Sequence, residues 1–194
     1  MQPFTYLRNN SWSQITREER YFCAELYFEI KKHPTQFIEF LNSRLQQNFE
    51  LNQHWEIGYE VCFYRDYLFS IGEPVRPTYK DIKYPQKRTF DLCLFSDTDV
   101  VIIEAKADQN FSEPQLKLLK KDKEILLPNL LKENGKVPSI SAFLLCSSQY
   151  DKDIDGFKKF FWNDLVDLFD NPIYKSADDL PTNKNPNIRS NSRI

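Results

Sequence analysis

The sequence predicts an α/β domain whose core is a mixed four-stranded sheet flanked by helices. Three strand-like segments follow one another between residues 55 and 107, which favours an antiparallel meander. A helix-like segment at 112–127 comes next, and a fourth strand-like segment lies at 139–147. A helical crossover of this kind makes the fourth strand parallel to the third. With a helix in front, the expected core order is αβββαβ.

Two helices are expected before the first strand. The segment from Thr16 to His33 carries apolar side chains at helical spacing, and Thr16 with Glu19 fits a capping box. Pro34 ends this helix and begins a second segment, 34–49, with the same spacing. Both helices therefore have an apolar face that can cover a sheet.

The three consecutive strands differ in pattern. Apolar and polar side chains alternate in 55–69, which predicts a strand exposed on one side. A proline-rich loop at 73–87 leads to the second strand, 88–95. The third strand, 99–107, contains the apolar run VVII and is expected to be buried on both faces.

Two more helices complete the expected domain. Ser112 is suited to cap the helix at 112–127, with Pro114 in its first turn. Aromatic and leucine side chains at helical spacing predict a closing helix at 155–169. The polar composition after it predicts a single domain at 1–174 and a polar tail at 175–194.

Composition excludes several classes of protein. The chain has 194 residues, four Gly and a net charge of -2, which excludes a glycine-rich phosphate loop and a general nucleic-acid coat. No segment reaches transmembrane length, and the first residues lack the apolar core of a signal peptide. The four Cys are far apart with no C-x-x-C, so we expect free thiols in a cytoplasmic protein.

Three residues on the second and third strands point to catalysis. Asp91 lies on the second strand, and a tight turn brings the third strand back beside it. Glu104 and Lys106 are two positions apart, so a strand directs both side chains to one face. Two neighbouring carboxylates both ionise only with a cation between them, and Mg²⁺ with oxygen ligands is the usual one. An isolated E-x-K is most often a salt bridge, and the pairing with Asp91 favours a metal site instead.

This pattern resembles the PD-(D/E)XK nuclease superfamily, which has the restriction-endonuclease-like fold. In that motif an acid on one strand precedes Glu-x-Lys on the next, and Asp91, Glu104 and Lys106 match its three positions. Phe90 stands where the motif has proline. The resemblance implies Mg²⁺, or Mn²⁺ in its place, bound by Asp91, Glu104 and the carbonyl of Ala105. It also implies that Lys106 positions the nucleophilic water or stabilises the transition state.

The resemblance extends to two helices. ERYFCAEL at 19–26 is similar to the first core helix of some members and assigns a further catalytic acid to Glu25. The helix after the motif can supply a substrate-binding side chain, for which Gln115 or Lys117 is the candidate. Glu60 on the first strand is the alternative to Glu25.

The resemblance implies a DNA endonuclease of restriction, repair or phage-defence type. Cleavage of both strands requires two active sites, so a homodimer is expected, with the aromatic closing helix and the tail as its contact surface. Two alternatives remain. A catalytically inactive member of the fold would bind nucleic acid or protein, and an unrelated α/β interaction module would carry E-x-K by chance.

Overall fold

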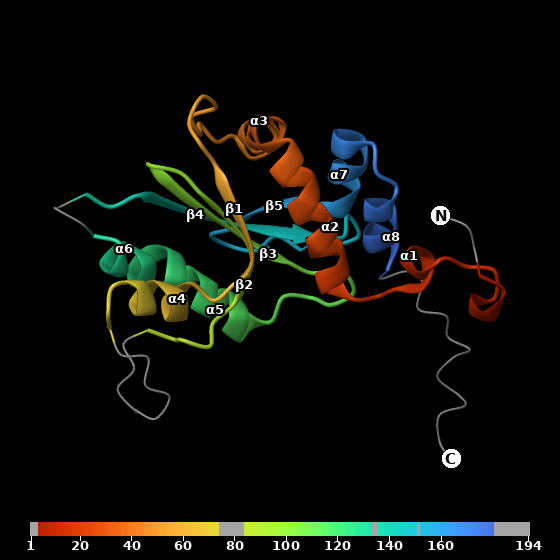
Figure 1. The fold of residues 1–194 in the computed structure, drawn as a ribbon, viewed down its shortest axis with the longest axis horizontal. Coiled ribbons are helices and arrows are strands. Elements are labelled where there is room, and N and C mark those ends of the chain that lie inside the picture. Colours follow the sequence, from red (N-terminus) through yellow and green to blue (C-terminus); the bar gives the residue numbers. More distant parts are fainter. Residues whose placement is uncertain (1–3, 74–83, 133–135, 151, 181–194) are drawn as a thin grey trace, which may run out of the picture.

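The computed structural model describes residues 4–73, 84–132, 136–150 and 152–180 and contains a five-stranded mixed sheet with helices on both faces (Figure 1). The strands lie side by side in chain order. They are β1 (Glu56–Val61), β2 (Phe90–Phe95), β3 (Asp99–Ala105), β4 (Ser139–Cys146) and β5 (Lys158–Phe161). The helices are α1 (Trp12–Ile15), α2 (Glu19–Lys32), α3 (Pro34–Leu45), α4 (Phe63–Ser70), α5 (Glu113–Lys121), α6 (Leu127–Leu130), α7 (Trp162–Phe169) and α8 (Ile173–Asp179).

The topology of the first four strands confirms the predicted meander and crossover. β1 pairs antiparallel with β2, and β2 pairs antiparallel with β3. The chain then passes through α5, a π-helical turn at Asp122–Leu126 and α6 before β4 joins β3 in parallel. The helix continues beyond Pro128, where we expected it to end, because proline is tolerated near the start of a helical segment and Pro128 lies in the first turn of α6.

A fifth strand replaces the start of the predicted closing helix. Residues 158–161 pair in parallel with β4, where Phe160 lies beside Leu145, and α7 begins only at Trp162. The expected four-stranded core and the helix at 155–169 are therefore wrong in this segment. The cause is tertiary: the edge of β4 offers unpaired backbone groups and a buried place for Phe160, and both outweigh local helical spacing.

The first strand is shorter than the predicted one. β1 ends at Val61 and α4 occupies Phe63–Ser70, so the strand expected over 55–69 is wrong in its second half. Glu60 has a φ of 51°, a left-handed conformation that interrupts an extended chain. The turn that follows lets Tyr64 enter the core from a helix.

Helices divide between the two faces of the sheet. Figure 1 shows α4, α5 and α6 on one side and α2, α3, α7 and α8 on the other. β3 is buried on both faces, as its apolar run predicts: Val101 and Ile103 join the core beneath α2, whereas Val100 and Ile102 join the core beneath α5. The site described below therefore starts from the most completely buried strand of the sheet.

The predicted cap of the long N-terminal helix is wrong. α2 begins at Glu19, and Thr16 ends the short helix α1 instead of capping α2. The Thr16 hydroxyl accepts a hydrogen bond from the Glu18 N–H at 3.4 Å within the turn between the two helices. Glu19 therefore occupies the first turn of α2.

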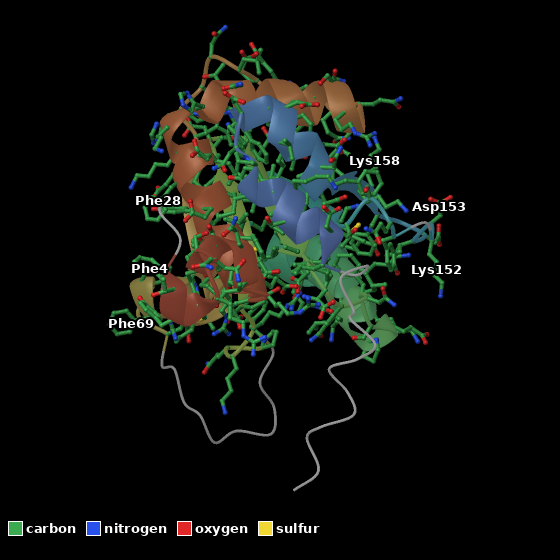
Figure 2. All side chains as sticks on the ribbon, turned by 90° about the vertical axis from the view of Figure 1, so that its right-hand side faces the viewer. Phe4, Phe28, Phe69, Lys152, Asp153 and Lys158 are labelled. Carbon is green, nitrogen blue, oxygen red and sulfur yellow. The ribbon has the colours of Figure 1, made fainter. Side chains whose placement is uncertain are left out.

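The aromatic residues near the C-terminus belong to the core. Phe160 and Trp162 are fully buried, so they are not available as a dimer contact surface. The exposed phenylalanines lie elsewhere, with Phe4, Phe28 and Phe69 along one border of the molecule (Figure 2). All four cysteines are free, as expected, and no helix among the described residues has the length and apolar character needed to cross a membrane.

The packed chain extends past residue 175, where the polar tail was expected to begin. α8 buries Tyr174 and Ala177 against α2 and α7, and Asp178 is 2% exposed. The remainder of the expected tail, 181–194, lies outside the described residues. The domain therefore continues at least to Leu180, which is buried in the same core.

Asp178 fastens α8 to the rest of the domain, so Asp178→Ala should lower the free energy of unfolding by about 2–4 kcal/mol. One carboxylate oxygen accepts from the Ser148 N–H at 2.7 Å and from the Asn163 N–H at 3.3 Å, and the other accepts from the Ser148 hydroxyl at 2.6 Å. The substitution removes all three hydrogen bonds, which tie α8 to Ser148 and to Asn163, and leaves a gap where the buried carboxylate was. Urea unfolding measures the change, and Asp179→Ala, which removes a surface pair with Lys175, is the control. Equal effects of the two substitutions would contradict this role.

Candidate functional site

The candidate site lies where β2 begins and β3 ends. The register pairs Leu92 with Ile103, so the next pair along the two antiparallel strands is Asp91 with Glu104. Directly opposed residues share a face of the sheet, and Lys106 follows on that face two residues beyond Glu104. The structure thus brings the three predicted catalytic residues together.

Asp91 is held by the backbone of β3. Its Oδ2 accepts a hydrogen bond from the Ala105 N–H at 2.8 Å. Burial raises the pKa of Asp91 above its ordinary value, although this hydrogen bond and the charges of Lys106 and Arg88 act in the opposite direction. A carboxylate with a raised pKa gains from any further cation placed beside it.

Both oxygens of Glu104 have protein partners. The Gln115 amide donates to Oε1, and Arg88 Nη2 donates to Oε2 at 3.2 Å. Burial, and then the negative charge of Asp91, raises the pKa of Glu104 from 4.5 to about 7, against the charges of Arg88 and Lys106 and the Gln115 hydrogen bond. The negative charge of Asp91 therefore opposes the ionisation of Glu104.

Lys106 is held in place at the same end of β3. Its Nζ donates to Glu19 Oε1 at 2.9 Å and to the Ala105 carbonyl at 2.7 Å. Burial lowers the pKa of Lys106. The charge and hydrogen bond of Glu19, together with the charges of Asp91 and Glu104, outweigh burial, so the net pKa is raised. Lys106 is therefore a charged, oriented ammonium group beside two carboxylates.

The acid that α2 directs towards the site is Glu19, not the predicted Glu25. Glu19 contacts Lys106 Nζ, and its Oε2 accepts from the Ala107 N–H at 3.2 Å. Glu25 lines a separate surface hollow of about 540 Å³ with Tyr21 and residues of α1 and α8. Glu60, the alternative candidate, pairs with Arg20 at 3.4 Å.

The two substrate-binding candidates on α5 point in different directions. Ser112 caps the helix as predicted, accepting from the Gln115 N–H at 3.4 Å, and the Gln115 side chain reaches Glu104. Lys117 pairs with Glu113 at 2.6 Å, and its side chain is 75% exposed. Gln115 therefore belongs to the site, whereas Lys117 lies on the solvent face of the helix.

Three further residues of the site were not predicted. Arg88 Nε donates to Asp122 Oδ2 at 3.1 Å while Nη2 reaches Glu104, and the Tyr64 hydroxyl donates to Asp122 Oδ1 at 2.6 Å. Asp122 is fully buried, and burial raises its pKa against the opposing effects of Tyr64 and Arg88. A signal existed for Asp122, because it shares the apolar stripe of Leu119 and Leu126 on the helix.

Similarity to known proteins does not assign this site. No protein-family model matches the chain, and no curated protein or solved structure is significantly similar to it. Among the described residues, no three His, Cys, Asp or Glu side chains are grouped so that they could hold a metal ion. What the site can do therefore follows from two facing carboxylates, one backbone carbonyl and their neighbours.

Glu19 and Glu25 of α2 can be compared directly by substitution. If the site performs the metal-dependent cleavage that the resemblance implies, Glu19→Gln should lower the rate about 10-fold, because outer-shell partners orient the groups that do chemistry and Lys106 would lose its charged partner. Glu25→Gln makes the same change in charge on the same helix and should have a much smaller effect. Initial cleavage rates of the two variants measure the difference, and a larger loss with Glu25→Gln would restore the assignment to Glu25.

Proposed function

We propose that this protein is a Mg²⁺-dependent nuclease that hydrolyses phosphodiester bonds, and specifically a DNA endonuclease of PD-(D/E)XK type. The observation that carries the proposal is the grouping of Asp91, Glu104 and Lys106 on adjacent strands, with Glu104 buried, Asp91 half-buried and the pKa of each carboxyl group raised. The order β1–β2–β3 antiparallel, helix, then β4 parallel supports a restriction-endonuclease-like core, to which β5 is added.

The charge of the buried cluster supports a divalent cation. Asp91, Glu104, Glu19 and Asp122 face Lys106 and Arg88, so four acids share two bases and the formal charge is two negative. The adjoining pairs Arg17–Asp108 and Arg20–Glu60 are each neutral. One divalent cation would balance the cluster. Without it, burial and then the negative charge of Asp91 raise the pKa of Glu104, so a proton takes the place of the cation there.

The donor set suits a hard cation. Asp91 and Glu104 would contribute carboxylate oxygens and Ala105 its carbonyl, with water completing the coordination. Gln115 would then orient Glu104, and each oxygen of Glu104 keeps a second lone pair beside its hydrogen bond from Gln115 or Arg88. When bound, such a cation lowers the pKa of a water molecule and offsets charge on the phosphate.

Lys106 would act on the substrate side of this arrangement. Its ammonium group is already oriented by Glu19, so little reorganisation is needed when negative charge develops on the attacked phosphate. Placed there, it would hold the nucleophilic water or stabilise the transition state. The hydrogen bond from Lys106 to the Ala105 carbonyl would have to be shared or released when that carbonyl binds the cation.

One observation favours a second function. Both oxygens of Glu104 and the carbonyl of Ala105 already have donors within the protein. A network that is satisfied in this way suits a catalytically inactive member of the fold, which would bind nucleic acid or protein and use the ion pairs for specificity of packing.

Calorimetric titration with Mn²⁺ separates the two functions. The nuclease proposal requires binding by the wild type and its loss in Asp91→Ala, which leaves Glu104, Lys106 and Arg88 in place. Absence of binding by the folded wild type, or equal binding by Asp91→Ala, would support the inactive network.

A further inference from the structure

A second set of charged groups lies behind Glu104, and the proposed chemistry does not use it. Arg88 is 11% exposed and joins two acids through different nitrogens: Nη2 to Glu104 and Nε to Asp122. Asp122 is fully buried at the start of the π-helical turn and also accepts from Tyr64. Ionised groups are rarely buried in this way without a specific partner or role.

The orientation of the guanidinium group is determined by Asp122 and not by Glu104 alone. Nε and Nη2 are occupied by different carboxylates, and the group lies over the Phe90 ring at 4.9 Å from its centroid. Arginine can otherwise grip one carboxylate with two parallel hydrogen bonds. The contact with Asp122 occupies Nε, so Arg88 cannot grip Glu104 through Nε and Nη2 together, and it makes a single hydrogen bond to Glu104.

We propose that Asp122 is a positioning residue for the cation site: by holding Arg88, it keeps Glu104 available to a divalent cation. This inference rests on the proposed function. Asp122 balances Arg88 as Glu19 balances Lys106, so Asp91 and Glu104 keep the two negative charges that a divalent cation would neutralise. Without Asp122, the charge of Arg88 would be directed wholly to Glu104 and would compete with the cation.

Three variants test this by Mn²⁺ calorimetry at pH 8.5, where protons compete least. Asp122→Asn should weaken Mn²⁺ binding about 10-fold, in the range found for outer-shell partners. Arg88→Gln removes the competing cation and should tighten binding about 10-fold. The double variant restores the formal charge of the cluster and should return to within about threefold of the wild type.

The opposite signs distinguish charge sharing from packing. If Asp122 and Arg88 served packing alone, both single variants would weaken binding and the double variant would not recover, and that result would overturn the inference. Glu113→Gln removes one negative charge at the exposed start of α5 and should leave the Mn²⁺ affinity unchanged. If it weakens binding as much as Asp122→Asn does, net charge alone explains the result and the inference is overturned.

The outcomes separate this inference from the function on which it rests. If the wild type binds no Mn²⁺, both the function and the inference are wrong. If the wild type binds Mn²⁺ and Asp122→Asn binds it with equal affinity, only the inference is wrong. If Asp122→Asn does not fold, the double variant carries the test, because an amide pair replaces the ion pair. A folded double variant whose Mn²⁺ affinity is more than about 10-fold below that of the wild type would then overturn the inference.

Discussion

Replacing Lys106 with methionine should reduce cleavage by about 10²–10³-fold, since this is the typical cost of removing one preorganised charge-stabilising group. Methionine keeps the length of the aliphatic stem, but it removes the ammonium group, which Glu19 orients and which lies 5.9 Å from the centroid of the Phe111 ring. Asp91 and Glu104 remain, so Mn²⁺ should still bind. Single-turnover rates with Mg²⁺ measure the loss, and calorimetry measures the retained binding.

Lys32→Met is the matched control for this substitution. Lys32 lies at the exposed end of α2, where it pairs with Glu29 at 3.6 Å, and its loss should leave the rate unchanged. If the wild type cuts DNA and Lys106→Met cuts equally well, the lysine serves structure alone. If Lys106→Met also loses Mn²⁺ binding, its role includes shaping the cation site and the separation of roles proposed here is wrong.

Glu104→Gln should stop cleavage and at the same time stabilise the metal-free protein at alkaline pH. The pKa of Glu104 is about 7 in the folded chain against an ordinary 4.5, so between these values the folded state binds more protons than the unfolded state. The free energy of unfolding must therefore fall as pH rises from about 4.5 to 7. Glutamine cannot ionise, and the variant should exceed the wild type at pH 8 by on the order of 2 kcal/mol.

Urea unfolding in EDTA at pH 5 and pH 8 measures this effect. The wild type should lose stability between the two values, whereas Glu104→Gln should lose less. Mg²⁺ should recover part of the loss in the wild type and none in the variant, because a ligand that binds the folded state alone stabilises it. A wild type that is more stable at pH 8 than at pH 5 in EDTA, with the variant unchanged from it, would contradict a buried Glu104 that resists ionisation.

The parts of the site that depend on strand geometry could be predicted from the sequence. Alternation along a strand places Glu104 and Lys106 on one face, and a tight turn returns Asp91 to the same place, so local rules suffice. The buried character of β3 follows equally from its apolar run. Gln115 is a candidate through the family resemblance alone, which does not separate it from Lys117, and its position in the first turn of α5 brings it to Glu104.

The features that could not be predicted from the sequence depend on tertiary contacts. Glu19 and Glu25 lie on the same helix, and the choice between them depends on where α2 begins and how it crosses the sheet. Arg88 precedes β2 outside any periodic pattern, so nothing local distinguishes it from an ordinary loop arginine. β5 forms because β4 has a free edge, and α4 forms where the left-handed Glu60 ends β1.

A digestion experiment tests the proposed nuclease activity most directly. Single-stranded and double-stranded DNA, RNA oligonucleotides and a supercoiled plasmid are incubated with the wild type and with Asp91→Ala, in Mg²⁺, in Mn²⁺ and in EDTA. We expect cleavage of at least one DNA substrate by the wild type with either metal, and none in EDTA or by Asp91→Ala. Intact substrates throughout, or equal cleavage by Asp91→Ala, would contradict a nuclease site at Asp91, Glu104 and Lys106.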